Sequence, residues 1–175
     1  MEPLQVEEPT LALQDSYRGL VREFIEAGEP LVPFTLEFAH DDFAAFVERL
    51  AACSRGEGVP PGFVPHTTLW LVRDGRDVLG VSNLRHRLTP GLRVEGGNIG
   101  YGVRPSARRR GHATRLLRGT LERARAVGLD RALLTCAKGN AGSVGTIRNC
   151  GGVFDSEEFI PARNEIVQRY WIDLR

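Results

Sequence analysis

Residues 99–114 read IGYGVRPSARRRGHAT and contain the clearest structural signals of the chain. Residues 98–104 have the alternation of a β-strand and end at Pro105, which cannot continue a strand ladder. A helix follows, because apolar side chains from Ala113 to Val127 recur every three or four residues and form one stripe. The segment between the two elements is rich in arginine. The sequence therefore predicts a strand, a basic loop and a long amphipathic helix in direct succession.

The basic loop is a candidate anion-binding site. The first turn of a helix presents unpaired N–H groups and the positive end of the helix dipole. Gly111 has no Cβ, so an anionic group can approach the backbone closely there. We expect the N–H groups from Arg109 to Thr114 to hold a phosphate or pyrophosphate. Four arginines add positive charge around this point: Arg108, Arg109, Arg110 and Arg115. The alternative is an ordinary helix start with solvated arginines.

The rest of the chain supplies further helices and strands. Helices are expected over 15–27, after a cap at Asp41, and over 140–149, and strands over 67–73, 77–87, 131–137, 159–161 and 165–173. Asp74-Gly75 is a turn signal between two strands, and Gly128 is the expected end of the long helix. Strands and helices alternate in the second half, which favours an α/β or mixed α+β fold with parallel pairing there.

Length and composition indicate one globular domain. The chain has 175 residues, of which 42% are hydrophobic and 26% charged. No apolar run approaches the ~20 residues that span a bilayer. Three cysteines without C-x-x-C spacing argue against a disulfide framework and a zinc cluster, so no metal site is expected. The N-terminus, MEPLQVEEP, lacks the basic and apolar regions of a signal peptide, and we expect the protein in the cytoplasm.

Charge is distributed unevenly, although the net charge is only +1. Residues 1–60 hold 12 acidic and 4 basic side chains, whereas residues 61–175 hold 10 acidic and 19 basic ones. The nine arginines between residues 104 and 131 allow a second hypothesis, a nucleic-acid-binding surface. The stripe lacks interleaved aromatic residues, and the pI of 7.8 is below the basic range of such domains, so this hypothesis is the less favoured one.

The same stretch carries a family resemblance. Arg108-x-x-Gly111-x-Ala113 is similar to the Gln/Arg-x-x-Gly-x-Gly/Ala loop that binds the acyl-CoA pyrophosphate in the GNAT N-acetyltransferase superfamily. The approach to the loop through Val103-Arg104-Pro105-Ser106 and the later segment Asn140-Ala141-Gly142-Ser143 also resemble this family. The resemblance extends over Thr67–Gly152, with the elements in the family's order.

The resemblance implies a fold and a division of the chain. The fold would be a central mixed sheet of six to seven strands, splayed between two parallel strands and flanked by helices. Residues 1–175 would form one acetyltransferase domain. Within it, residues 1–60 would be a variable helical part, residues 67–152 the acyl-CoA-binding core, and residues 153–175 the closing strands.

The resemblance also implies an activity and a donor. The chain would be an N-acetyltransferase in which a primary amine attacks acetyl-CoA directly, with the thioester carbonyl polarised by backbone N–H groups near Tyr101 and Val103. The cofactor would lie where strands 98–104 and 131–137 separate. Its implied binding residues are Tyr101, Val103, Arg108, Arg109, Arg110, Gly111, His112, Ala113, Thr114, Asn140 and Ser143.

Two positions depart from the family pattern. Several members carry a strand glutamate where this chain has Gly97, so the general base is open between Glu95 and His86. The non-catalytic alternatives are a loop carboxylate for Glu95 and a surface histidine for His86. Many members also place a tyrosine, the proton donor to the leaving thiolate, where this chain has Ile147. These departures leave a catalytically silent acyl-CoA-binding module as a further alternative.

The sequence gives less information about the acceptor than about the donor. Aromatic and acidic residues near the N-terminal helices suggest a cleft for a cationic amine, namely Pro33, Phe34, Glu37, Phe38, Asp41, Asp42 and Trp70. Solvated loops and a helix cap are the alternative. Small-molecule and peptide amines both stay open as acceptors, no membrane partner is expected, and a homodimer is left open.

Overall fold

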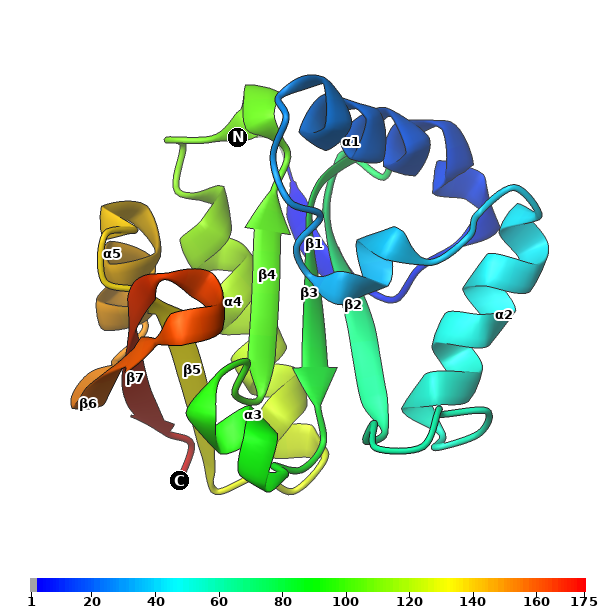
Figure 1. Ribbon diagram of the computed structural model, residues 1–175. Coiled ribbons are helices and arrows are strands. Elements are labelled where there is room, and N and C mark those ends of the chain that lie inside the picture. The colour runs from blue at the N-terminus through cyan, green and yellow to red at the C-terminus, as the bar shows by residue number, and fades with distance from the viewer. Residues whose placement is uncertain (1–2) are drawn as a thin grey trace.

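The computed structural model describes residues 3–175 and has a mixed α/β architecture (Figure 1). Met1 and Glu2, the start of the acidic N-terminus, lie outside the described residues. The described strands form two antiparallel sheets, of order β1-β2-β3-β4 and β5-β7-β6. Their bounds are β1 Leu4–Glu7, β2 His66–Arg73, β3 Asp77–Arg85, β4 Ile99–Val103, β5 Arg131–Ala137, β6 Val153–Ile160 and β7 Glu165–Asp173. This arrangement confirms the predicted fold class.

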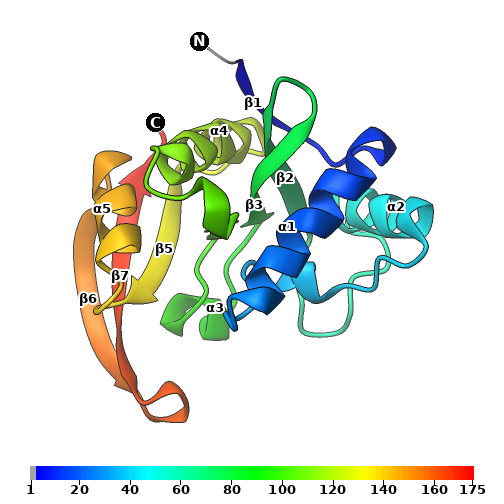
Figure 2. The same cartoon turned by 90° about the horizontal axis from the view of Figure 1, so that it is seen from above.

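Helices cover both faces of the first sheet (Figure 2). On one face, α1 (Gln14–Glu26) and α2 (Phe43–Ser54) pack on Trp70 and its neighbours in β2 and β3. On the other face, α4 (His112–Ala126) packs through Leu116 on residues of β2 and β3 and through Leu117 on Leu84. The second sheet packs on α4 and α5 (Ala141–Asn149), and the short α3 (Pro90–Val94) precedes β4. Since both of its faces are covered, β2 is buried along most of its length.

Local sequence signals place most elements within two residues of their expected bounds. Asp74 and Gly75 have positive φ angles of 52° and 65°, which a tight hairpin turn between β2 and β3 requires. The cap of α2 is Asp42, whose carboxylate accepts from the Ala45 N–H at 3.0 Å, and not Asp41 as expected. The strand expected over 159–161 is longer and begins at Val153. The prediction missed its first part because β6 is an edge strand whose mostly exposed side chains lack alternation.

Strands β4 and β5 are parallel neighbours that meet at only one end. The N–H of Asn98, just before β4, donates to the carbonyl of Leu133 in β5 at 2.7 Å, and the Leu133 N–H donates to Asn98 Oδ1 at 2.9 Å. The two strands run in the same direction and then diverge (Figure 1). The expected splay is therefore present. Parallel ladders in the second half were wrongly expected, because β7 inserts between β5 and β6 and pairs antiparallel with both.

The described residues include no helix with the length and apolar character needed to cross a bilayer. The three cysteines are free thiols, with Cys53 and Cys136 buried and Cys150 half-buried.

Candidate functional site

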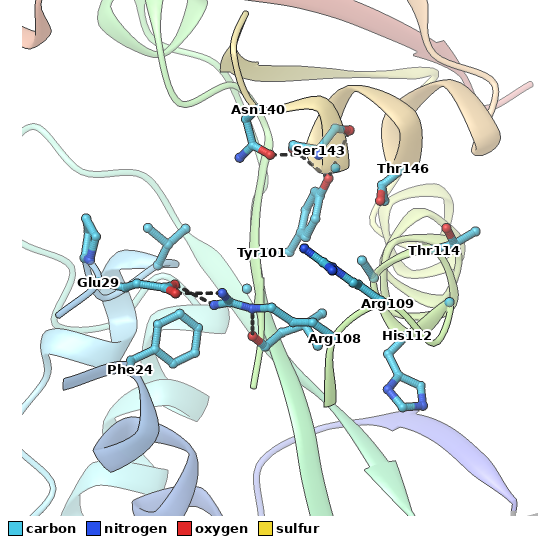
Figure 3. A pocket seen from close by; sticks show the side chains of 17 residues that line it. Phe24, Glu29, Tyr101, Arg108, Arg109, His112, Thr114, Asn140, Ser143 and Thr146 are labelled. Carbon is cyan, nitrogen blue, oxygen red and sulfur yellow. Dashed lines mark hydrogen bonds and ion pairs between the residues drawn. The ribbon is translucent and has the colours of Figure 1, made fainter. Parts of the chain in front are cut away.

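A cavity of about 610 Å³ lies where β4 separates from β5 (Figure 3). Its walls come from the end of α1 and the loop after it, from β4, from the loop that begins α4, and from the start of α5. Most of the residues proposed from the sequence line it: Tyr101, Val103, Arg108, Arg109, Gly111, His112, Ala113, Thr114, Asn140 and Ser143. Arg110 does not line the cavity.

The loop before α4 leaves the N-terminus of this helix open. Gly111 is the N-cap residue with φ 79° and ψ 2°, and no side chain caps the first turn. A Cβ on Gly111 would meet nothing within 4 Å. The His112 ring is held by a hydrogen bond from Nδ1 to the Ala107 carbonyl at 2.8 Å, so the ring points away from the other labelled side chains in Figure 3. The N–H groups of the first turn are therefore available to a ligand in the cavity.

Arg108 is engaged within the protein. Its guanidinium donates to both carboxylate oxygens of Glu29, at 2.7 and 2.6 Å, and its Nε donates to the Val103 carbonyl at 3.0 Å. The hydrogen bonds from Arg108 lower the pKa of Glu29, so this carboxylate is charged at neutral pH. Arg108 thus joins the loop after α1 to the end of β4, with its charge balanced. Arg109, by contrast, has φ 60° and points toward Tyr101 (Figure 3).

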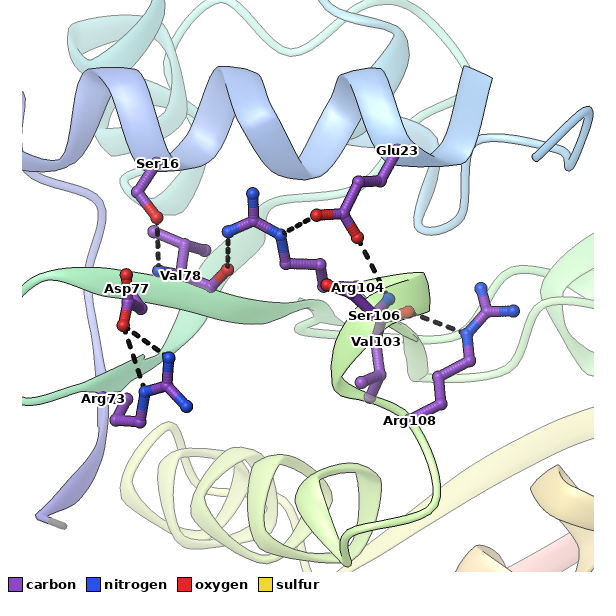
Figure 4. Close-up of polar contacts among 9 residues, drawn as sticks. All are labelled: Ser16, Glu23, Arg73, Asp77, Val78, Val103, Arg104, Ser106 and Arg108. Atoms are coloured by element: carbon purple, nitrogen blue, oxygen red, sulfur yellow. Dashed lines mark hydrogen bonds and ion pairs between the residues drawn. The ribbon is translucent and has the colours of Figure 1, made fainter. Parts of the chain in front are cut away.

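A second ion pair fixes α1 against the end of β4 (Figure 4). Glu23 accepts from Arg104 Nε at 2.7 Å and from the Ser106 N–H at 3.0 Å. Arg104 Nη1 also donates to the Val78 carbonyl of β3 at 3.4 Å. Burial alone would raise the pKa of Glu23, but these hydrogen bonds outweigh it and lower the pKa. This network therefore adds to the apolar packing that holds α1 beside the cavity.

The opposite wall is organised around the start of α5. Asn140 Oδ1 accepts from the Ser143 N–H at 3.0 Å, which makes Asn140 the N-cap of the helix. The Ser143 hydroxyl lies 2.9 Å from the Tyr101 hydroxyl. Burial raises the pKa of Tyr101 to about 12, so the phenol keeps its proton at neutral pH. Thr146 also lines the cavity and was missed, although it lies one helical turn beyond Ser143.

Backbone N–H groups of β4 face the gap between the sheets. The Arg104 N–H donates to the Leu79 carbonyl of β3 at 2.8 Å. Because N–H groups alternate between the two edges of a strand, those of Tyr101 and Val103 point to the other edge, toward β5. The Val103 carbonyl accepts from Arg108 on this same edge. Two N–H groups thus lie beside the cavity where a carbonyl oxygen can bind.

Two glycines of this region allow close backbone approaches. A Cβ on Gly102 would lie 2.2 Å from the Val32 carbonyl oxygen, because the loop after α1 crosses β4 there. A Cβ on Gly97 would lie 2.3 Å from the Leu133 carbonyl oxygen. A glutamate at position 97 would therefore require the backbone to shift where β4 meets β5. The other departure, Ile147, is fully buried in the core beneath α5.

The two candidate bases lie outside the cavity lining. Glu95 follows α3, and its Oε2 lies 3.4 Å from Arg163 Nη1. His86 follows β3, and its Nε2 lies 2.7 Å from the Thr67 hydroxyl. Burial lowers the pKa of His86. Neither side chain is therefore placed to contact a ligand in the cavity.

Two residues of the expected acidic and aromatic cleft have other roles. Trp70 is 0% exposed and stacks on Tyr17 with ring centres 4.9 Å apart, so it belongs to the core. Asp42 is used as a helix cap. Cavity residues that the sequence did not reveal come instead from the end of α1 and the following loop, namely Phe24, Glu29, Pro30 and Val32. These residues reach β4 only through tertiary contacts, which no local pattern signals.

Comparison with known proteins is consistent with this geometry. The family model described as an acetyltransferase (GNAT) domain matches residues 3–153. No curated protein matches significantly. Among solved structures, RimJ of Mycobacterium smegmatis in complex with CoA-disulfide has a TM-score of 0.69 at 17% identity, over 97% of this chain and 81% of that one.

Two further solved structures show the same fold. The microcin C7 self-immunity acetyltransferase MccE, in complex with acetyl-CoA and AMP, has a TM-score of 0.68 at 15% identity, covering 97% of this chain and 92% of that chain. The spermidine N-acetyltransferase of Vibrio cholerae, described as a dodecamer, has a TM-score of 0.65 at 14% identity, covering 98% and 94%.

Proposed function

The chain belongs to the GNAT acetyltransferase family, and on this premise we propose that it transfers the acetyl group of acetyl-CoA to a primary amine. The observation that carries the proposal is the open N-terminus of α4 at the edge of the cavity between β4 and β5. A helix start whose N-cap is Gly111 suits a pyrophosphate, since no side chain caps the N–H groups of the first turn or blocks them.

The residues around the cavity fit the donor along its length. The loop from Arg108 to Thr114 would hold the pyrophosphate. Arg109 would supply the positive charge, because Glu29 balances the charge of Arg108. Asn140 and Ser143 would lie beside the pantetheine arm. When bound, acetyl-CoA supplies an acetyl group activated as a thioester.

The backbone of β4 would assist the transfer. The N–H groups of Tyr101 and Val103 face the gap, where they would stabilise negative charge on the thioester oxygen. The amine nitrogen forms a bond to the acetyl carbon, the C–S bond breaks, and one amine proton is lost. Tyr101 remains protonated and lines the cavity, so it is the candidate donor of a proton to the leaving thiolate. Glu95 and His86 stay the candidate bases; since neither lines the cavity, whichever one acts would do so through water.

The competing hypotheses receive less support. Several arginines of the basic stretch are paired with carboxylates, Arg104 with Glu23 and Arg108 with Glu29, which leaves less free charge for a nucleic acid. A catalytically silent acyl-CoA-binding module differs from the proposed enzyme only in turnover. The cytoplasmic location and the homodimer stay predictions from the sequence.

Thermal unfolding with acetyl-CoA, and with ATP as the anion control, tests donor binding. At a ligand concentration near 100 times Kd, linkage predicts ~2.7 kcal/mol of stabilisation, or roughly 5–10 °C in Tm for a chain of this size. A shift with acetyl-CoA and none with ATP is expected. Thiol release with a panel of primary amines then tests transfer. No shift at millimolar acetyl-CoA would refute the proposal, and binding without turnover of any amine would indicate the silent module.

A further inference from the structure

An arginine of β3, Arg85, lies beside the cavity without being part of its lining. We call the part of the lining formed by Tyr101 and Val32 the acceptor end, to distinguish it from the part formed by the loop that begins α4. Arg85 donates from Nη1 to the carbonyl oxygens of Gly96 and Gly97, at 3.0 and 3.2 Å. A Cβ built on Gly100, the residue before Tyr101, would lie 3.9 Å from Arg85 Nη2. The guanidinium is therefore adjacent to the acceptor end.

The surroundings of Arg85 are aromatic and positively charged. The guanidinium carbon lies 5.4 Å from the centre of the Phe34 ring, and that of Arg49 lies 3.7 Å from the centre of the Phe38 ring. His66 is paired with Arg85 across β2 and β3 and is 1% exposed. The pKa of His66 is lowered to about 4, mainly by burial and next by the charge of Arg85, so the ring is neutral at neutral pH. The acidic N-terminal third had predicted the opposite charge here.

Arg85 differs from Arg104 and Arg108, the two ion-paired arginines at the end of β4 and in the loop after it. Arg104 and Arg108 form ion pairs with Glu23 and Glu29, at 2.7 and 2.6 Å. Arg85 has no carboxylate within ion-pair distance among residues 3–175. Burial lowers its pKa, but a guanidinium remains protonated in proteins. A half-buried cation without a counterion costs free energy, which an anionic ligand group would recover.

We propose that the acceptor is an amine of the amino-acid type, and that Arg85 binds its carboxylate while the amino group faces the gap beside Tyr101. The inference rests on the proposed acetyl transfer to an amine. Because Nη1 is held by the carbonyls of Gly96 and Gly97, Nε and Nη2 are left for the two carboxylate oxygens. The Phe34 ring and these carbonyls hold the guanidinium plane in place.

The first experiment compares amines that share a skeleton and differ by the carboxylate. Lysine is paired with cadaverine, ornithine with putrescine, and phenylalanine with phenethylamine, each with acetyl-CoA, and thiol release is followed. We expect kcat/KM to be at least 10-fold higher for the carboxylate member of at least one pair. Phosphoethanolamine is included because a phosphate would also suit a guanidinium.

The second experiment uses Arg85→Gln and Arg85→Lys with a matched control, Arg18→Gln. Arg18 also donates to backbone carbonyls, those of His40 and Asp41, and its guanidinium carbon lies 5.6 Å from the Phe43 ring centre. Arg85→Gln should raise KM for the carboxylate amine at least 10-fold with little change in kcat. Arg85→Lys should recover part of the loss, and Arg18→Gln should have no effect on KM.

The outcomes separate this inference from the proposed function. The acetyl-CoA-induced shift in Tm should persist in Arg85→Gln, which shows that the donor site and the fold are intact. Equal or better turnover of the decarboxylated amines or of phosphoethanolamine would overturn the carboxylate assignment while acetyl transfer stands. Donor binding without turnover of any carboxylate amine would overturn it too. If Arg85→Gln does not fold, the substrate pairs with the unaltered protein decide the question.

Discussion

Gly111 offers a direct test of the donor site, because aspartate and asparagine there differ in charge and little in shape. The residue has φ 79°, and a Cβ would meet nothing within 4 Å. Asparagine and aspartate tolerate this backbone conformation better than other side chains, at a cost of about 1 kcal/mol. Both variants should therefore fold, with a similar loss of stability.

The two variants should differ in acetyl-CoA affinity. Either side chain at the N-cap can accept hydrogen bonds from the first turn of α4, and so competes with the pyrophosphate. Aspartate adds one negative charge. At a separation of ~5 Å and an effective dielectric constant of ~20, its repulsion of one phosphate charge is ~3 kcal/mol, and ~1 kcal/mol in a water-like environment. Gly111→Asp should thus bind acetyl-CoA roughly 5- to 150-fold more weakly than Gly111→Asn.

Isothermal titration of acetyl-CoA at low and high salt checks this expectation. The difference between Gly111→Asp and Gly111→Asn should shrink at high ionic strength, because salt screens exposed charges. Unaltered circular dichroism of both variants controls for folding. Equal affinity of the two variants for acetyl-CoA at low salt would refute the placement of the pyrophosphate at the start of α4.

Two further predictions concern stability. Gly102→Ala places a Cβ 2.2 Å from the Val32 carbonyl oxygen, so it should lower the free energy of unfolding in urea by about 1–3 kcal/mol. The control Gly139→Ala, whose Cβ would meet nothing within 4 Å, should change it by less than about 0.5 kcal/mol. Equal losses in the two variants would contradict the crossing of the loop over β4. His66 has its pKa lowered to about 4, so the unfolded state binds an extra proton below pH ~6.5, and the free energy of unfolding should fall by up to about 3 kcal/mol between pH 6.5 and 4. His66→Gln should flatten this slope in urea unfolding at pH 7, 6 and 5, and an unchanged slope would show that other groups cause it.

The elements that the sequence revealed are those with local signals. The apolar stripe of α4, the glycine at its start and the Asp74-Gly75 turn each depend on residues close in the chain, and each lies where expected. The same applies to α5, which begins within one residue of the helix predicted over 140–149. A ligand site built on one loop and one helix start was therefore accessible without a structure.

The remainder depends on contacts between distant segments. Glu29 meets Arg108, and Val32 meets Gly102, only after α1 has packed on the sheet. The insertion of β7 between β5 and β6 is likewise non-local, so the sense of pairing was misjudged. The charge near Phe34 was misjudged as well, since it comes from Arg85 of β3 and not from the acidic residues beside Phe34 in sequence.

The crossing of the loop after α1 over Gly102 has a consequence for protein engineering. Exchanging the N-terminal segment for that of another family member is an obvious route to new acceptors. In this chain Glu23, Glu29 and Val32 fasten the segment to β4 and the loop after it. A graft that omits these residues would leave Gly102 without its contact to the loop, and Arg104 and Arg108 without counterions. Chimaeras should therefore be cut after β1 and before β2, with all three attachment points matched to β4 and its following loop.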